Sequence, residues 1–295
     1  MSNFGGLTEE DIRGKAPRFS VISVPYDLTA SYGEGARRGP GAIIEASTHM
    51  ELYDEETGDE PCAAGIETLA PLEPTAAGPE EMIKEVTSTV DVILDAGKIP
   101  VVLGGEHSIT LGAVKAALER YPDLSVLQFD AHADMRDSFQ GTPFSHACVA
   151  RRISELCPIV QVGIRSMSLA EAGFLKGAGG EGKTIKTYHA SPISGGTAPE
   201  EVAEKALKDL TGDVYITVDI DVLDPSIMPA TGTPEPGGLG WYEVLNILKN
   251  VISKRTIRGF DVVELSPLPG MAAPDFLAAK LVYKIMAYIN EGMKC

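Results

Sequence analysis

Three potential metal ligands follow an apolar run in the segment VLQFDAHAD, residues 126–134. Asp130, His132 and Asp134 alternate there, and residues at i, i+2 and i+4 of an extended chain project from one face. Two carboxylates about 4 Å apart repel by roughly 4 kcal/mol at an effective dielectric constant of about 20. The pattern therefore predicts either a positive charge among these side chains or protonated carboxyl groups.

Two further apolar runs end in residues of the same kinds. ITVDIDVLDP (216–225) places Asp219 and Asp221 at i and i+2, and VVLGGEHS (101–108) ends with His107 at the start of a helical pattern. A single Asp at a strand end often only caps the next helix, and a lone His is more often structural than a ligand. A cap needs one acceptor, however, so capping does not account for three acceptors on one face. The joint pattern favours a metal centre.

Two divalent cations would balance the charges of the four aspartates. Six side chains can give two cations four protein ligands each only if some carboxylates bridge, and bridging carboxylates hold metals about 3.5–4 Å apart, as in two-metal hydrolytic sites. Mixed Asp and His ligation without Cys suits Mn²⁺, and less well Zn²⁺, Fe²⁺, Co²⁺ or Ni²⁺. The predicted ligands are His107, Asp130, His132, Asp134, Asp219 and Asp221.

Short β-branched runs alternate with helical patterns along the chain. The expected strands are 19–27, 98–105, 124–130, 159–166, 184–190, 214–221 and 257–265. The expected helices are 79–97, 108–121, 199–212, 241–253 and 273–292. Most of the strand runs are apolar on both faces, which is typical of parallel strands covered by helices, in a sheet that is either open or closed into a barrel. In both architectures the active site lies at the carboxyl ends of the strands.

The composition is that of an ordinary globular protein. Its 295 residues include 42 acidic and 25 basic side chains, and the net charge of −17 argues against nucleic-acid binding. We find neither an apolar leader nor a run of about 18 apolar residues, so no membrane association is expected. The four cysteines form no CxxC pair, which favours a reduced, cytoplasmic protein. With no linker or repeat, we expect one domain over residues 1–295.

The segments GGEHS (104–108), DAHAD (130–134) and DIDVLDP (219–225) resemble the three metal motifs of the ureohydrolase family, which comprises arginases, agmatinases and their relatives. The resemblance extends to residues 24–47, 229–239 and 259–267. It implies a three-layer α/β/α sandwich with an open, mostly parallel, eight-stranded sheet. It also implies a binuclear manganese centre that hydrolyses a guanidino group to an amine and urea.

The resemblance also implies roles for individual residues. One Mn²⁺ would be held by His107, Asp130, Asp134 and Asp219, and the other by Asp130, His132, Asp219 and Asp221. Asp130 and Asp219 would bridge the two ions. Glu264 matches the family carboxylate that pairs with the substrate guanidinium, whose fork of donors calls for such a partner. Without the resemblance, Glu264 is more simply read as a surface acid at a strand end.

The proton shuttle of the family has two candidates in this chain. Many family members carry a histidine directly before the glycine of the loop that here reads QGTPFSHA (140–147), so the aligned residue is Gln140. Glutamine cannot shuttle protons at neutral pH, whereas His146 titrates in the right range. We therefore expect His146 to protonate the departing amine. A structural, hydrogen-bonding histidine is the alternative.

The loop after DAHAD indicates the substrate. It reads MRDSFQGTPFSHA (135–147), and the Asn/Ser pattern with which arginases bind the carboxylate and amine of an amino acid is absent from it. The resemblance therefore favours a small cationic guanidino substrate, agmatine, cleaved to putrescine and urea in polyamine biosynthesis. Arginine and guanidinobutyrate stay open as substrates. The family also suggests a homo-oligomer, either a trimer or a hexamer.

Other functions fit the residues less well. A metal-dependent (β/α)₈ barrel hydrolase usually carries an HxH motif after its first strand, and VPYDLTASYG (24–33) has no histidine. The related deacetylases use a single zinc and three ligands, whereas six ligands are present here. A metal-binding homologue without catalysis is disfavoured by the intact ligand set, and urea release with added Mn²⁺ distinguishes it.

Overall fold

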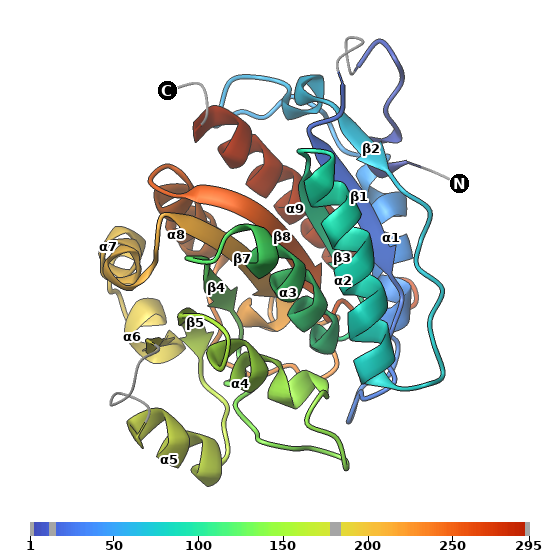
Figure 1. Cartoon of the computed structure of the whole chain (residues 1–295). Coiled ribbons are helices and arrows are strands. Elements are labelled where there is room, and N and C mark those ends of the chain that lie inside the picture. The colour runs from blue at the N-terminus through green and yellow to red at the C-terminus, as the bar shows by residue number, and fades with distance from the viewer. Residues whose placement is uncertain (1–2, 12–15, 178–183, 293–295) are drawn as a thin grey trace.

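A parallel sheet forms the centre of the computed structural model, which describes residues 3–11, 16–177 and 184–292 (Figure 1). Its strands are β1 (Phe19–Val24), β2 (Ile66–Thr68), β3 (Ile99–Gly104), β4 (Ser125–Phe129), β5 (Ile159–Ile164), β6 (Ile185–His189), β7 (Asp213–Asp219) and β8 (Thr256–Val263). The eight strands lie in the order β2-β1-β3-β8-β7-β4-β5-β6, and each neighbouring pair is parallel. The expected open, eight-stranded sheet is confirmed.

Helices cover both faces of the sheet. They are α1 (Gly39–Ser47), α2 (Pro79–Asp95), α3 (Thr110–Arg120), α4 (Val149–Ser154), α5 (Leu169–Gly177), α6 (Ala190–Ser194), α7 (Pro199–Asp209), α8 (Trp241–Ile252) and α9 (Ala273–Gly292). Figure 1 shows α2, α3 and α4 in front of the sheet, where their apolar residues form one buried cluster. Helices α1, α7, α8 and α9 belong to the other cluster. The three-layer α/β/α arrangement is therefore confirmed.

Each inner strand contributes to both apolar clusters. In β3, Val101 and Leu103 pack with the cluster of α1, α8 and α9, while Val102 packs with the cluster of α2 and α3. In β1, Val21 and Ile22 divide in the same way. Strands that are buried on both faces favour apolar side chains on both, which explains the mainly apolar runs in the sequence.

Some elements lie where the sequence predicted none. These are β2, α1, α4, α5 and α6. Among the described residues, no helix has the length and apolar character needed to cross a membrane. The side chains of Cys62, Cys148 and Cys157 are buried thiols, and Cys295 lies outside the described residues.

The loops after the central strands approach one another closely. Gly105 follows β3, and a Cβ atom added to it would lie 2.0 Å from the carbonyl oxygen of Tyr26, in the loop after β1.

Strand β4 ends at Phe129, so the segment 130–134 is not extended strand, and Asp134 has a left-handed φ of 51°. Our prediction that strand alternation points the side chains of Asp130, His132 and Asp134 in one direction is therefore wrong. The loop itself must direct these side chains.

Candidate active site

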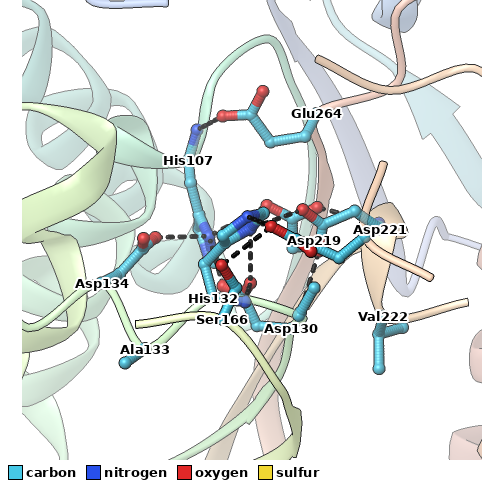
Figure 2. A network of polar contacts seen from close by, with 12 residues as sticks. His107, Asp130, His132, Ala133, Asp134, Ser166, Asp219, Asp221, Val222 and Glu264 are labelled. Carbon is cyan, nitrogen blue, oxygen red and sulfur yellow. Dashed lines mark hydrogen bonds and ion pairs between the residues drawn. The ribbon is translucent and has the colours of Figure 1, made fainter. Parts of the chain in front are cut away.

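The six predicted metal ligands lie together at the carboxyl ends of β3, β4 and β7 (Figure 2). Two groups of side chains each bring their ligand atoms within 4.8 Å of one another. The groups are His107, Asp130 and Asp134, and Asp130, His132 and Asp221. Asp130 belongs to both groups. The remaining aspartate, Asp219, places Oδ2 at 3.4 Å from Nδ1 of His107.

The first group surrounds a ring nitrogen that has no hydrogen-bond partner among the described residues. Nδ1 of His107 lies 3.1 Å from Oδ2 of Asp130 and 3.4 Å from Oδ2 of Asp134. This nitrogen is buried, and no described residue forms a hydrogen bond with it. Buried polar atoms are nearly always satisfied. A buried imidazole nitrogen that faces three carboxylate oxygens therefore fits a divalent cation.

The second group is built around His132. Its Nδ1 lies 2.8 Å from Oδ2 of Asp221 and 3.7 Å from Oδ1 of Asp130. Asp130 thus directs one oxygen toward each histidine, as a bridging carboxylate would. Two backbone groups hold the other acids: Ala131 N–H donates to Oδ1 of Asp221, and Asp221 N–H donates to Oδ1 of Asp219, both over 2.9 Å.

The protonation of this cluster indicates a need for positive charge. Burial, with the carboxylates of Asp134 and Asp221, raises the pKa of Asp130 to about 7. Burial also raises the pKa of Asp219 well above its ordinary value. Burial opposes the protonation of His132, but nearby carboxylates, Asp221 foremost, raise its pKa to about 11. The cluster therefore binds protons that a divalent cation would displace.

A chain of three polar groups orients His107 from the side away from the other ligands. The hydroxyl of Thr217 donates to Oδ1 of Asp261 over 2.5 Å, and Tyr215 donates to Oδ2 over 3.0 Å. Nε2 of His107 lies 2.8 Å from the same Thr217 oxygen. Because the Thr217 hydrogen is directed to Asp261, His107 donates from Nε2, which leaves the Nδ1 lone pair for a metal.

Thr217→Val is expected to weaken metal binding by about 10- to 100-fold, because it removes the hydrogen bond that sets the tautomer of His107. Chelator competition on the purified variant measures this affinity. Thr217→Ser restores the hydroxyl and should restore most of the affinity. Unchanged metal affinity in Thr217→Val would show that this hydroxyl does not control the ligand.

Thr217 and Asp261 were missed in the sequence, although a signal was present. Thr217 stands two residues before Asp219, on the same strand face, and Asp261 is a charged residue between Phe260 and Val262 in β8. Arg165 was also missed. Its guanidinium donates to the backbone carbonyls of Asp221 and Glu235, among others, over 2.6 and 2.9 Å. It thereby ties the end of β5 to the loops after β7.

A cleft of about 310 Å³ opens onto the metal-binding cluster. Its lining includes Glu264 and His146, and among the described residues it does not include Gln140, which is exposed. Figure 2 shows Glu264 on the opposite side of His107 from the loop of Ala133. Oε1 of Glu264 accepts a 2.7 Å hydrogen bond from the His107 backbone N–H.

The environment of Glu264 suits a cationic partner. Burial and the neighbouring carboxylate of Glu106 raise the pKa of Glu264 to about 8. Its φ of 66° is left-handed, a strained conformation for a residue with a side chain. A guanidinium in the cleft would favour the ionised form of this carboxylate.

His146 is the titratable side chain at another wall of the cleft. Burial lowers its pKa, and the ring of Phe139 meets it edge-on with the centroids 5.8 Å apart. The structure therefore brings His146 to the cleft as expected and leaves Gln140 outside. Its catalytic role stays a prediction.

The sequence profile described as "Arginase family" matches residues 17–288. The chain belongs to the arginase family. As a ureohydrolase it is a hydrolase that acts on guanidino compounds, and the family depends on a binuclear metal centre. The two groups of His and Asp residues described above could bind metal in this arginase-family chain.

Relatives of known name share this arginase-family sequence over nearly its whole length. The N(1)-aminopropylagmatine ureohydrolase of Synechocystis sp. is 40% identical over 93% of this chain and 90% of that protein. The agmatinase of Pyrococcus horikoshii is 35% identical over 91% and 90%. The crystal structure of the agmatine ureohydrolase of Thermoplasma volcanium superposes with a TM-score of 0.87 at 32% identity, covering 100% of this chain and 96% of that one.

Proposed function

We propose that this enzyme hydrolyses the guanidino group of agmatine, or of agmatine extended by an aminopropyl group, to an amine and urea. The observation that carries the proposal is the position of Glu264, a half-buried carboxylate that lines the same cleft as Asp219 and Asp221. A guanidinium paired with Glu264 would present its central carbon toward the metal-binding cluster.

The proposal assigns the metal site to His107, Asp130, His132, Asp134, Asp219 and Asp221, and the metal to two Mn²⁺ ions per chain. Oxygen and imidazole donors without thiolate support manganese. When bound, the two ions supply the Lewis acidity that activates water for attack at neutral pH. Activity after loading the chelated protein with Mn²⁺, Zn²⁺ or Co²⁺ tests the identity of the metal.

The side chains of the cleft would perform the remaining steps. Glu264 holds the guanidinium through paired charge-assisted hydrogen bonds and fixes its orientation. His146 lies in the same cleft and would give its proton to the nitrogen of the departing amine, so that a neutral amine leaves. The leaving nitrogen is a poor leaving group without that proton, which is why a titratable residue is needed here.

The names of the relatives bear on the choice between the two substrates, which differ by one aminopropyl group. Four of the curated relatives are named N(1)-aminopropylagmatine ureohydrolases, and they are 36–40% identical to this chain. Relatives named agmatinase are 33–35% identical. These names support the aminopropyl compound as a second candidate substrate beside agmatine.

Agmatine and N(1)-aminopropylagmatine should each exceed arginine in kcat/KM by at least about 10²-fold. The reason is that the carboxylate of arginine would have no partner in the cleft, which costs several kcal/mol. The cleft also contains Arg136, but its Nε lies 3.8 Å from Oε2 of Glu171, so its charge is already matched. Urea release by the manganese-loaded enzyme is measured with agmatine, N(1)-aminopropylagmatine, guanidinobutyrate and arginine. A preference for either carboxylate-bearing compound would instead make Arg136 a substrate contact. No urea from any of the four would indicate a non-catalytic homologue.

A further inference from the structure

Thr29 lies at the junction of three polar groups beside the cleft. It belongs to the loop after β1 and is only 4% exposed. Its Oγ1 is 2.7 Å from Oε1 of Glu106, 3.1 Å from Nδ1 of His146 and 3.1 Å from the backbone nitrogen of His146. The loops after β1 and β3 and the loop that carries His146 therefore meet at one hydroxyl.

The directions of these hydrogen bonds follow from the environment of Glu106. This fully buried carboxylate also accepts the backbone N–H of Thr29 over 2.6 Å and the hydroxyl of Ser108 over 2.6 Å. The carboxylate thus acts as the acceptor in each of these contacts, and the single hydroxyl hydrogen of Thr29 is directed to Oε1 of Glu106, 2.7 Å away.

The hydroxyl oxygen of Thr29 then has two lone pairs for His146. It can accept one hydrogen bond from the backbone N–H of His146 and one from the ring Nδ1–H. The bond from the ring requires His146 to carry its hydrogen on Nδ1. The nitrogen left for the cleft is Nε2.

We propose that Thr29 and Glu106 are positioning residues that hold His146 as the Nδ1–H tautomer, with Nε2 as the atom that moves the proton. This inference rests on the proposed role of His146 in amine departure. In the protonated ring both nitrogens carry hydrogen. The Nδ1–H group keeps its hydrogen bond to the Thr29 hydroxyl, and the proton on Nε2 is transferred to the departing nitrogen as the bond between that nitrogen and the guanidino carbon breaks. The ring is then neutral and needs no rotation before Nε2 takes up the next proton.

Thr29→Val tests the relay, because valine keeps the shape of threonine and lacks the hydroxyl. We expect kcat to fall by about 10-fold or more, since general acid catalysis contributes about 10²–10⁴-fold and depends on orientation. KM and the manganese content should change little, because the hydroxyl of Thr29 bonds to Glu106 and His146, which are neither predicted metal ligands nor the guanidinium partner. Thr29→Ser should restore kcat.

A double-mutant cycle separates the relay from a structural role. In the His146→Ala background, adding Thr29→Val should have little further effect on kcat. Thr89→Val is the matched control, because the Thr89 hydroxyl only donates to the Glu85 carbonyl on the exposed side of α2. It should behave as the unmodified enzyme.

Each result of the cycle bears on a different claim. If Thr29→Val lowers kcat by the same factor with and without His146, Thr29 does not act through the histidine and the relay is overturned. If His146→Ala keeps full activity on agmatine, the shuttle assignment falls and the relay with it. If no guanidino compound is cleaved by the unmodified, manganese-loaded enzyme, the proposed function itself is wrong.

Discussion

Asp130→Asn is expected to remove both metal ions from the purified enzyme and to lower kcat by at least about 10³-fold. Asp130 is the residue shared by the two ligand groups, and its two oxygens face His107 and His132 separately. Two metal ions contribute several kcal/mol of transition-state stabilisation, and each 1.36 kcal/mol is about tenfold in rate. Elemental analysis and urea release measure the two effects.

The design of this test includes two comparisons. His132→Asn affects one group only, so it should weaken one ion more than the other. Asp123→Asn places the same substitution on an exposed aspartate shortly before β4 and should leave metal content and activity unchanged. Retention of both ions in Asp130→Asn would exclude Asp130 as the bridging ligand.

Glu264→Gln should lower kcat/KM for agmatine by about 10³-fold while both metal ions are retained. Glutamine preserves the size of the side chain and can still accept the hydrogen bond from the His107 backbone, which Oε1 of Glu264 now accepts over 2.7 Å. It lacks the negative charge, and truncating one partner of a buried charge pair costs about 2–5 kcal/mol. The measurements are steady-state urea release and the metal content of the same sample.

The control for this variant is Glu119→Gln on the exposed surface of α3, which should be silent. If Glu264→Gln instead loses metal, Glu264 supports the metal site and is not the guanidinium partner. A variant with full kcat/KM would place the guanidinium elsewhere in the cleft.

The predicted metal ligands could be found in the sequence because parallel strands end at a common edge. The strands β3, β4 and β7 are apolar runs with clear ends, so His107, Asp130 and Asp219 were expected to meet there. Asp134 was included for a wrong reason. Its direction depends on a left-handed φ of 51° within a loop, and strand alternation has no part in it.

Other features depend on contacts between distant residues and leave little local pattern. Helix α1 begins within Gly-Pro-Gly at residues 39–41, a sequence typical of a loop, and it packs against α9. Strand β2 has only three residues, too few to show alternation. The partnership of Thr29 with Glu106 spans 77 positions, so no spacing rule could indicate it.

The order of the sheet has a consequence for synthesis of the chain on the ribosome. Strand β8 is made last, yet it lies between β3 and β7 and pairs with both. The described strands made earlier therefore form two half-sheets, β2-β1-β3 and β7-β4-β5-β6, with no strand pairing between them. Their inner edges stay open during translation, and open parallel edges are sites of misassociation.

The active site is divided between the same two halves. His107 follows β3 in the first half, whereas Asp130 follows β4 in the second, and Glu264 arrives with β8 itself. Placing β8 would therefore join the half-sheets, bring His107 close to Asp130 and add Glu264, the proposed partner of the guanidinium. We therefore expect a nascent chain that has not yet placed β8 to lack the assembled site.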